Sequence, residues 1–114
     1  MTKHLSIIDA ANNVNYLNGK IGGESVINTT KRLKELPNIF EDEEVFLKLN
    51  GEEIIYEVQA LFPVAEGIEG GLFYGKTIIR PGKVGDEYYM TKGHFHQKAD
   101  RGEFYWGIEG EGML

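Results

Sequence analysis

The feature that most constrains the fold is a change of pattern at Glu53. From that residue to the end of the sequence, short runs of β-branched and aromatic residues are separated by Gly and Pro. Such runs are typical of β-strands joined by turns. We expect strands near residues 53–62, 71–80, 86–96 and 103–110. The pattern therefore predicts an all-β fold for this part of the chain.

The residues before this change, 1–52, are predicted to form an N-terminal extension with short helices. Thr29 or Thr30 is suited to cap a helix that runs to Leu36 and ends at the following proline. Asp42 is suited to cap a second helix that ends at the next glycine. The apolar positions of both helices indicate packing against the sheet.

Length and composition limit the classes of protein to consider. A chain of 114 residues is long enough for one domain, which we expect to cover residues 1–114. Fifteen glycines with only three prolines indicate many turns rather than a low-complexity linker. A formal net charge of −6 argues against non-specific binding to nucleic acid. Because there is no cysteine, disulfides and thiolate metal sites are excluded.

The sequence also bears on location. The N-terminus has no apolar signal region, and no apolar run approaches the roughly 18 residues of a membrane span. A chain without cysteine fits a reducing compartment. We therefore expect a cytoplasmic protein that has neither a nucleic-acid partner nor a membrane partner.

Two of the three histidines lie close to a carboxylate near the C-terminus. On a strand, His94 and His96 share one face, and a hairpin through the polar residues 98–102 would return Glu103 to meet them. A histidine pair with this spacing is more often exposed on a strand than bound to a metal. The neighbouring carboxylate favours a metal, because two imidazoles and one carboxylate leave open positions suited to Fe²⁺ and usable by Zn²⁺, Mn²⁺ or Ni²⁺.

The residues around this cluster carry a family resemblance. Residues 93–96 (Gly-His-Phe-His), Glu103 and residues 107–112 (Gly-Ile-Glu-Gly-Glu-Gly) resemble the first cupin motif. More narrowly, residues 81–96 (Pro-Gly-Lys-Val-Gly-Asp-Glu-Tyr-Tyr-Met-Thr-Lys-Gly-His-Phe-His) resemble the archaeal-type, metal-dependent glucose-6-phosphate isomerases of the cupin superfamily. A weaker similarity extends back through residues 55–58. The resemblance implies a cupin-type double-stranded β-helix, or jelly-roll, barrel built from residues 53–114 and either complete or partial.

The resemblance also implies a reaction and a set of residues. An enzyme of this family is an aldose-ketose isomerase that interconverts glucose 6-phosphate and fructose 6-phosphate with one divalent metal ion, and a homodimer is expected. The metal positions fall on His94, His96 and Glu103, and Glu103 is also the candidate catalytic proton shuttle. A metal-assisted hydride shift is the competing mechanism. The substrate-binding positions fall on Tyr56, Thr77, Thr91 and Gly93, with Tyr105 near the sugar.

The sequence departs from the family after the first motif. Cupins of this type carry a second motif with a further histidine ligand, and the sequence ends before such a motif. The chain is therefore expected to be a fragment truncated after the first motif, a short protein whose barrel a second copy closes, or a non-catalytic module that binds a metal or a sugar phosphate. A cupin Fe²⁺ dioxygenase that uses the same three ligands is the alternative enzyme.

Overall fold

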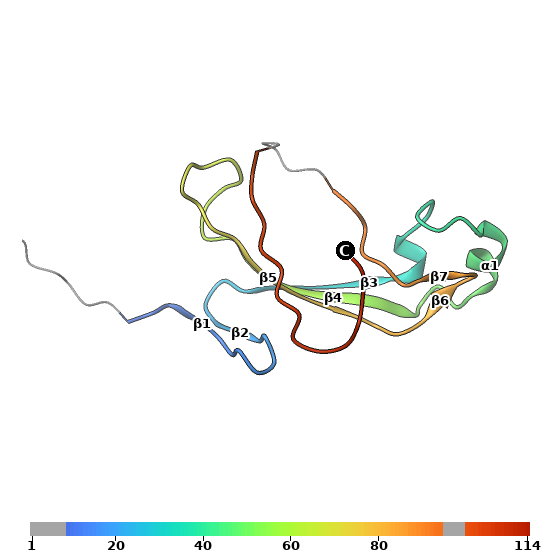
Figure 1. The fold of residues 1–114 in the computed structure, drawn as a ribbon, viewed down its shortest axis with the longest axis horizontal. Helices are drawn as coiled ribbons and strands as arrows, with labels where there is room; N and C mark the ends of the chain where they lie inside the picture. The colour runs from blue at the N-terminus through green and yellow to red at the C-terminus, as the bar shows by residue number, and fades with distance from the viewer. Residues whose placement is uncertain (1–8, 95–99) are drawn as a thin grey trace, which may run out of the picture.

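A computed structural model describes residues 9–94 and 100–114 of the chain. The described part is built mainly of strands, as predicted, and it contains no closed barrel (Figure 1). No helix in this part is long and apolar enough to cross a membrane. In chain order the elements are β1 (Asn12–Val14), β2 (Ile21–Gly23), β3 (Ile27–Arg32), the 3-10 helix η1 (Leu33–Glu35), α1 (Glu43–Lys48), β4 (Ile54–Leu61), β5 (Tyr74–Ile79), β6 (Lys83–Val84) and β7 (Glu87–Tyr88).

The central sheet is antiparallel, with β4 between β3 and β5. Strands β4 and β5 confirm the strands predicted near 53–62 and 71–80. Val58 lies opposite both Thr29 and Thr77, so these three side chains share one face of the sheet. On the other face the β1–β2 hairpin approaches β4, and the Ile21 N–H donates a 2.6 Å hydrogen bond to the Gln59 side chain.

The first predicted helix is wrong, because its first part, up to Arg32, belongs to β3. The run of β-branched residues around Thr29 and Thr30 pairs with β4, and this pairing outweighs the local capping signal. Helical structure is limited to the single turn of η1, where the Arg32 N–H donates to the Glu35 carboxylate at 2.8 Å. The second predicted helix is confirmed as α1, and the Asp42 carboxylate caps it by accepting the Val45 N–H at 3.0 Å.

The hydrophobic core lies at one end of the central sheet, where η1, α1 and the β6–β7 hairpin meet (Figure 1). Partly buried side chains of α1 and of the segment after β7 pack against it. Two consecutive β4 residues, Ile55 and Tyr56, are both buried where the β3–β4 register shifts between Lys31 and Arg32. We call the buried set the core cluster: Leu33, Leu36, Phe40, Ile55, Tyr56 and Val84.

The β6–β7 hairpin depends on close contacts at its glycines. Gly85 has φ +60° in the two-residue turn, a conformation that favours glycine. At Gly82, a Cβ atom would lie 2.4 Å from the ring of Tyr89. The ring therefore packs directly on the backbone, and burial raises the pKa of the Tyr89 hydroxyl.

Two predicted strands are not formed as expected. Of the range 86–96, only Glu87–Tyr88 is a strand, residues 89–94 have no regular structure, and residues 95 and 96 lie outside the described residues. Residues 103–110 form no strand. The alternating pattern stabilises a strand only when a neighbouring strand supplies hydrogen bonds. Among the described residues, pairing with β6 and the 2.9 Å hydrogen bond from the Tyr89 N–H to the Gly82 carbonyl end at Tyr89, and residues 103–110 have no strand partner.

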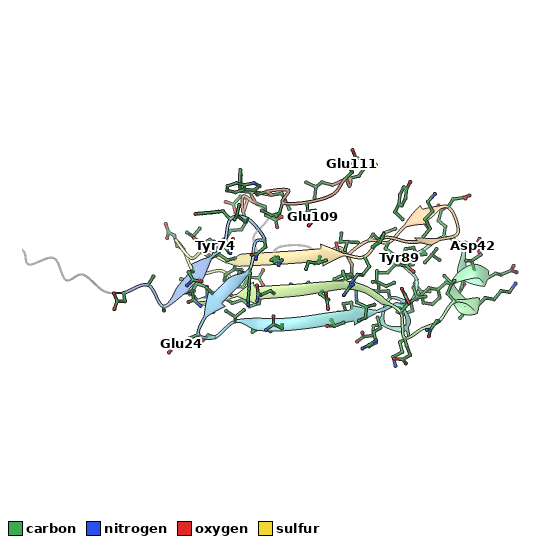
Figure 2. The ribbon with its side chains drawn as sticks, turned by 90° about the horizontal axis from the view of Figure 1, so that it is seen from below. Glu24, Asp42, Tyr74, Tyr89, Glu109 and Glu111 are labelled. Atoms are coloured by element: carbon green, nitrogen blue, oxygen red, sulfur yellow. The ribbon has the colours of Figure 1, made fainter. Side chains whose placement is uncertain are left out.

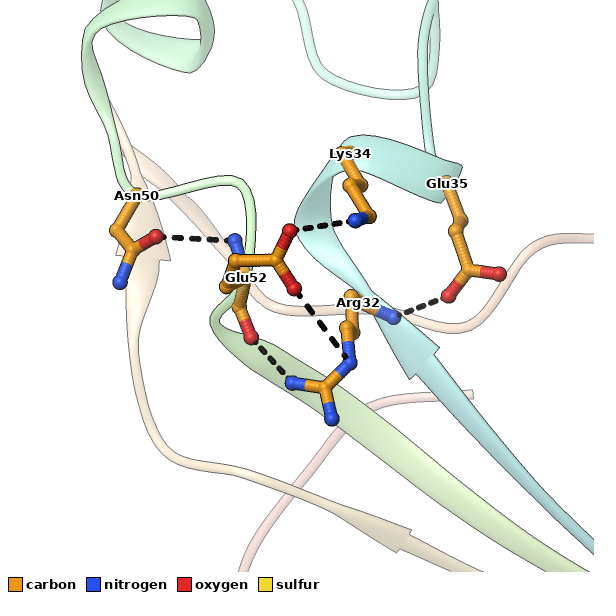
Figure 3. Close-up of polar contacts among 5 residues, drawn as sticks. All are labelled: Arg32, Lys34, Glu35, Asn50 and Glu52. Atoms are coloured by element: carbon orange, nitrogen blue, oxygen red, sulfur yellow. Dashed lines mark hydrogen bonds and ion pairs between the residues drawn. The ribbon is translucent and has the colours of Figure 1, made fainter.

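A group of polar side chains joins η1 to the turn before β4 (Figure 3). The Glu52 carboxylate accepts a hydrogen bond from the Lys34 ammonium, and its other oxygen lies 3.9 Å from the Arg32 guanidinium. The Asn50 side chain accepts the Glu52 N–H at 3.0 Å. The hydrogen bond from Lys34 is the main reason that the pKa of Glu52 lies below its ordinary value.

Candidate active site

The predicted site residues from two segments of the chain come together around one pocket of about 410 Å³. One segment, residues 91–94, follows β7. The other lies within residues 100–114, and we call residues 100–114 the C-terminal segment. Five residues predicted for the site are among those that line it. We call it the candidate pocket, and its lining is Thr91, Lys92, Gly93, His94, Arg101, Glu103 and Tyr105.

Residues 91–94 all line the candidate pocket because their backbone is irregular. On a regular strand, Thr91 would point away from His94. The chain leaves the strand geometry after Tyr88, so consecutive residues can face the same space. The structure thus brings Thr91 and Gly93 beside His94 without requiring a bulge in a continuous strand.

Glu103 and Tyr105 form a pair on the other wall of the candidate pocket. Two residues apart on an extended chain, they lie on the same side, and the Tyr105 hydroxyl donates a hydrogen bond to the Glu103 carboxylate. This hydrogen bond is the main reason that the pKa of Tyr105 is raised. Tyr105 thereby helps to fix the orientation of the planar carboxylate.

Tyr56 links the candidate pocket to the core cluster. Its ring is buried in that cluster, while its hydroxyl accepts the Lys92 N–H at 3.5 Å. Thr77 is exposed on β5 and does not line the candidate pocket. The register places Tyr56 opposite Ile79 and Thr77 opposite Val58, so Tyr56 and Thr77 share one face of the sheet.

The predicted metal ligands are only partly placed. His94 and Glu103 line the same pocket, whereas His96 lies outside the described residues. Among the residues that are described, no three acidic or histidine side chains form a group able to hold a metal ion. An imidazole and a carboxylate are donors that suit a divalent cation. The ligand set of His94, His96 and Glu103 therefore stays a prediction, with two of its members on one pocket.

Two cationic residues of the candidate pocket, Lys92 and Arg101, were not among the predicted site residues. The sequence indicates them, together with Lys98, only as local positive charge that could attract a dianionic phosphate. Taken one at a time, each is more often a solvated surface residue. The lining holds these two cations and one carboxylate, Glu103, in a chain whose formal net charge is −6.

The C-terminal segment also touches the β1–β2 hairpin. The rings of Trp106 and Tyr16 stack with centroids 5.5 Å apart. A Cβ atom on Gly19 would lie 3.6 Å from the Ile108 side chain. Figure 2 shows this segment, with Glu109 and Glu111, beyond the β5 side of the central sheet. These contacts hold the segment that carries Glu103 and Tyr105 near the sheet.

The part of the chain that matches a known protein family includes every residue that lines the candidate pocket. Residues 30–114 match the family model described as glucose-6-phosphate isomerase (GPI). The chain belongs to the glucose-6-phosphate isomerase family. This match confirms the resemblance found in residues 81–96, and it includes β4, β5 and both walls of the candidate pocket.

Relatives at high identity agree with the family match. A glucose-6-phosphate isomerase of Thermococcus kodakarensis is 47% identical over 85 residues, which are 74% of this chain and 44% of that protein. A second, from Thermococcus litoralis, is 41% identical over 93 residues, covering 80% of this chain and 48% of the relative. A third, from Pyrococcus horikoshii, is 40% identical over 103 residues, which are 89% of this chain and 52% of the relative. The chain spans about half the length of the curated relatives it matches.

Proposed function

We propose that this chain supplies the substrate and metal site of a metal-dependent glucose-6-phosphate isomerase. The observation that carries the proposal is the candidate pocket. It lies within the family match and gathers His94, Glu103, Thr91 and Gly93 from two segments. The substrate class follows from the relatives, which are named glucose-6-phosphate isomerases.

Glu103 is proposed to move the proton. Its carboxylate takes the proton from C2 of the open-chain glucose 6-phosphate, the C–H electron pair forms the C1–C2 double bond, and the C1 carbonyl electron pair moves to O1 to give an enediolate. The O2 hydroxyl passes its proton to O1, the O2 electron pair forms the C2 carbonyl, and the same carboxylic acid returns its proton to C1, which gives fructose 6-phosphate. The Tyr105 hydroxyl holds the carboxylate in place during both transfers.

The metal would be held by His94, His96 and Glu103. A divalent ion bound there, most readily Fe²⁺, with Zn²⁺, Mn²⁺ or Ni²⁺ as substitutes, would supply polarisation of the substrate's oxygens. The Thr91 hydroxyl and the Gly93 N–H are proposed to bind the substrate as hydrogen-bond donors, because both residues line the candidate pocket. Tyr56 and Thr77 lie on one face of the central sheet, and the Tyr56 hydroxyl accepts the Lys92 N–H beside the candidate pocket. We keep both as proposed substrate-binding residues.

We also propose a homodimer in the cytoplasm. Phe62 and Phe73, next to the ends of β4 and β5, pack edge to face with ring centroids 4.9 Å apart, and both are exposed. An exposed apolar patch of this kind is typical of an association surface. A second copy of the chain would cover it, and light scattering of the purified chain measures the mass directly.

The decisive experiment is conversion of fructose 6-phosphate by the chain after reconstitution with Fe²⁺. We expect turnover that a chelator abolishes and that added metal restores. Bound metal without turnover would instead indicate a non-catalytic binding module, and oxygen consumption with a small substrate would indicate the dioxygenase. Reaction in D₂O separates the mechanisms: a proton shuttle through Glu103 that exchanges with solvent places deuterium at C2 of the glucose 6-phosphate formed, whereas a hydride shift does not.

A further inference from the structure

Arg101 lies on the candidate pocket in a position that the proposed mechanism does not use. It lines the same space as Thr91 and Gly93, the residues proposed to bind the substrate. Its side chain is half-buried, unlike most of the C-terminal segment. A guanidinium at this place therefore faces the space that a sugar phosphate would fill.

The loop between β4 and β5 holds the guanidinium from behind. Both terminal nitrogens of Arg101 donate to the Ile68 carbonyl oxygen at 3.5 Å. The same oxygen accepts the Gly71 N–H at 3.1 Å, so a turn of the loop orients it. Arginine has five N–H donors in a fixed planar fork. Because the Ile68 carbonyl uses only two of these donors, the remaining N–H groups of Arg101 can bind a second acceptor.

Arg101 takes part in none of the ion pairs found among the described residues. These pairs, Arg32–Glu52, Lys34–Glu52 and Arg80–Glu57, involve other cations. Glu69 and Asp100 line a neighbouring space of about 280 Å³ together with Arg101, outside ion-pair distance of it. Lys92 adds a second positive charge to the candidate pocket, whose lining has one carboxylate, Glu103. The lining thus holds more cationic than anionic side chains, on an acidic chain.

We infer that Arg101 binds the phosphate group of the sugar phosphate and sets the preference of the site for phosphorylated over neutral sugars. The inference rests on the proposed function for the identity of the sugar. Its chemistry is that of a guanidinium fork, which binds two oxygens of a phosphate at once. Lys92 provides additional attraction without the same geometry.

The test measures binding of fructose 6-phosphate, inorganic phosphate and fructose to the full chain by calorimetry and NMR titration. We expect Arg101→Gln to lower the affinity for fructose 6-phosphate and for phosphate by about 10- to 100-fold, because a charge-assisted bidentate contact is lost. The affinity for fructose should not change. Arg101→Lys should lower the two phosphate-ligand affinities less. Lys48→Gln, at the end of α1, removes the same charge away from the candidate pocket and should change nothing.

Each outcome decides the inference. Equal affinity of wild type and both Arg101 variants for fructose 6-phosphate overturns it, as does a wild-type chain that binds neither phosphate ligand. If Arg101→Gln fails to fold in a thermal melt, the Arg101→Lys result decides: weakened phosphate binding supports the inference, and unchanged binding overturns it. Selective phosphate binding without isomerisation would refute the proposed function and leave the role of Arg101 intact.

Discussion

The core cluster and the C-terminal segment differ in how their side chains are used. Residues of the core cluster are buried where η1, β4 and the β6–β7 hairpin meet, and Leu33 is only 1% exposed. In the C-terminal segment, Phe104 is 86% exposed and no regular element forms. Yet this segment supplies Arg101, Glu103 and Tyr105 to the candidate pocket. Stability and proposed chemistry therefore lie in different parts of the molecule.

Tyr56 is the point where the two regions meet. Its ring belongs to the core cluster, and its hydroxyl accepts the Lys92 N–H beside the candidate pocket. Packing of the core cluster thus fixes the position of residues 91–94, the wall of the candidate pocket that follows β7. The wall formed by the C-terminal segment depends on weaker contacts, among them the stack of Trp106 on Tyr16.

The largest expected effect separates chemistry from stability. Glu103→Gln keeps a hydrogen-bond acceptor for Tyr105 and removes the group proposed to carry the proton, so turnover should fall by about 10²- to 10⁴-fold. Substrate binding should fall much less, and the urea midpoint should not change. Initial rates, calorimetry and urea unfolding measure the three quantities. Glu109→Gln, in the same segment, is the matched control, and a fully active Glu103→Gln enzyme contradicts the role.

The next prediction concerns the core cluster. Leu33→Ala removes a buried side chain and leaves a cavity, which should lower the free energy of unfolding by about 2–5 kcal/mol. Leu47→Ala is the control, because Leu47 is 73% exposed on α1 and should cost less than about 0.5 kcal/mol. Urea denaturation of both variants gives the difference. Equal losses would mean that the core cluster does not hold the fold.

A smaller effect is expected where the two regions meet. Tyr56→Phe keeps the ring in the core cluster and removes the acceptor of the Lys92 N–H, so stability should fall by about 0.5–1.5 kcal/mol. Amide resonances of residues 91–94 should shift, while those of α1 stay in place. Tyr74→Phe, on the exposed side of β5, serves as the control. Unchanged resonances for residues 91–94 would argue against the link.

The smallest effect depends on pH. Because Lys34 lowers the pKa of Glu52 in the folded chain, Glu52 contributes stability above the ordinary glutamate pKa, and that contribution is lost as pH falls through the lowered value. Both side chains are exposed, so solvent screens the pair and the contribution is small. Urea midpoints of wild type and Glu52→Gln should differ slightly at neutral pH and converge in acid. A gap that widens in acid would contradict the assigned sign.

Local pattern and tertiary pairing explain which elements could be predicted. Strands β4 and β5 and helix α1 followed from periodicity and from the cap at Asp42, which are local signals. Strand β3 did not, because its pairing with β4 is decided by residues almost thirty positions away. The alternation in residues 103–110 predicted a strand, but a strand also needs a partner that the described residues do not provide.

The site was predictable to the extent that its residues belong to a family motif. Thr91, Gly93, His94, Glu103 and Tyr105 were named from the resemblance, and they line one pocket. Thr77 was named in the same way and lies outside that lining. Arg101 was named only as one of several positive charges that could attract a phosphate, since its position depends on a carbonyl of the β4–β5 loop that no local pattern places beside it.

The most direct test of the account is an NMR titration of the full, isotope-labelled chain with fructose 6-phosphate. We predict that the largest amide shifts fall on residues 91–94 and 101–105 and that η1 and α1 stay unchanged. That result would place the sugar phosphate in the candidate pocket, on the weakly packed part of the molecule. Shifts confined to η1 and α1, or saturation with no shift in either wall of the candidate pocket, would contradict the central claim.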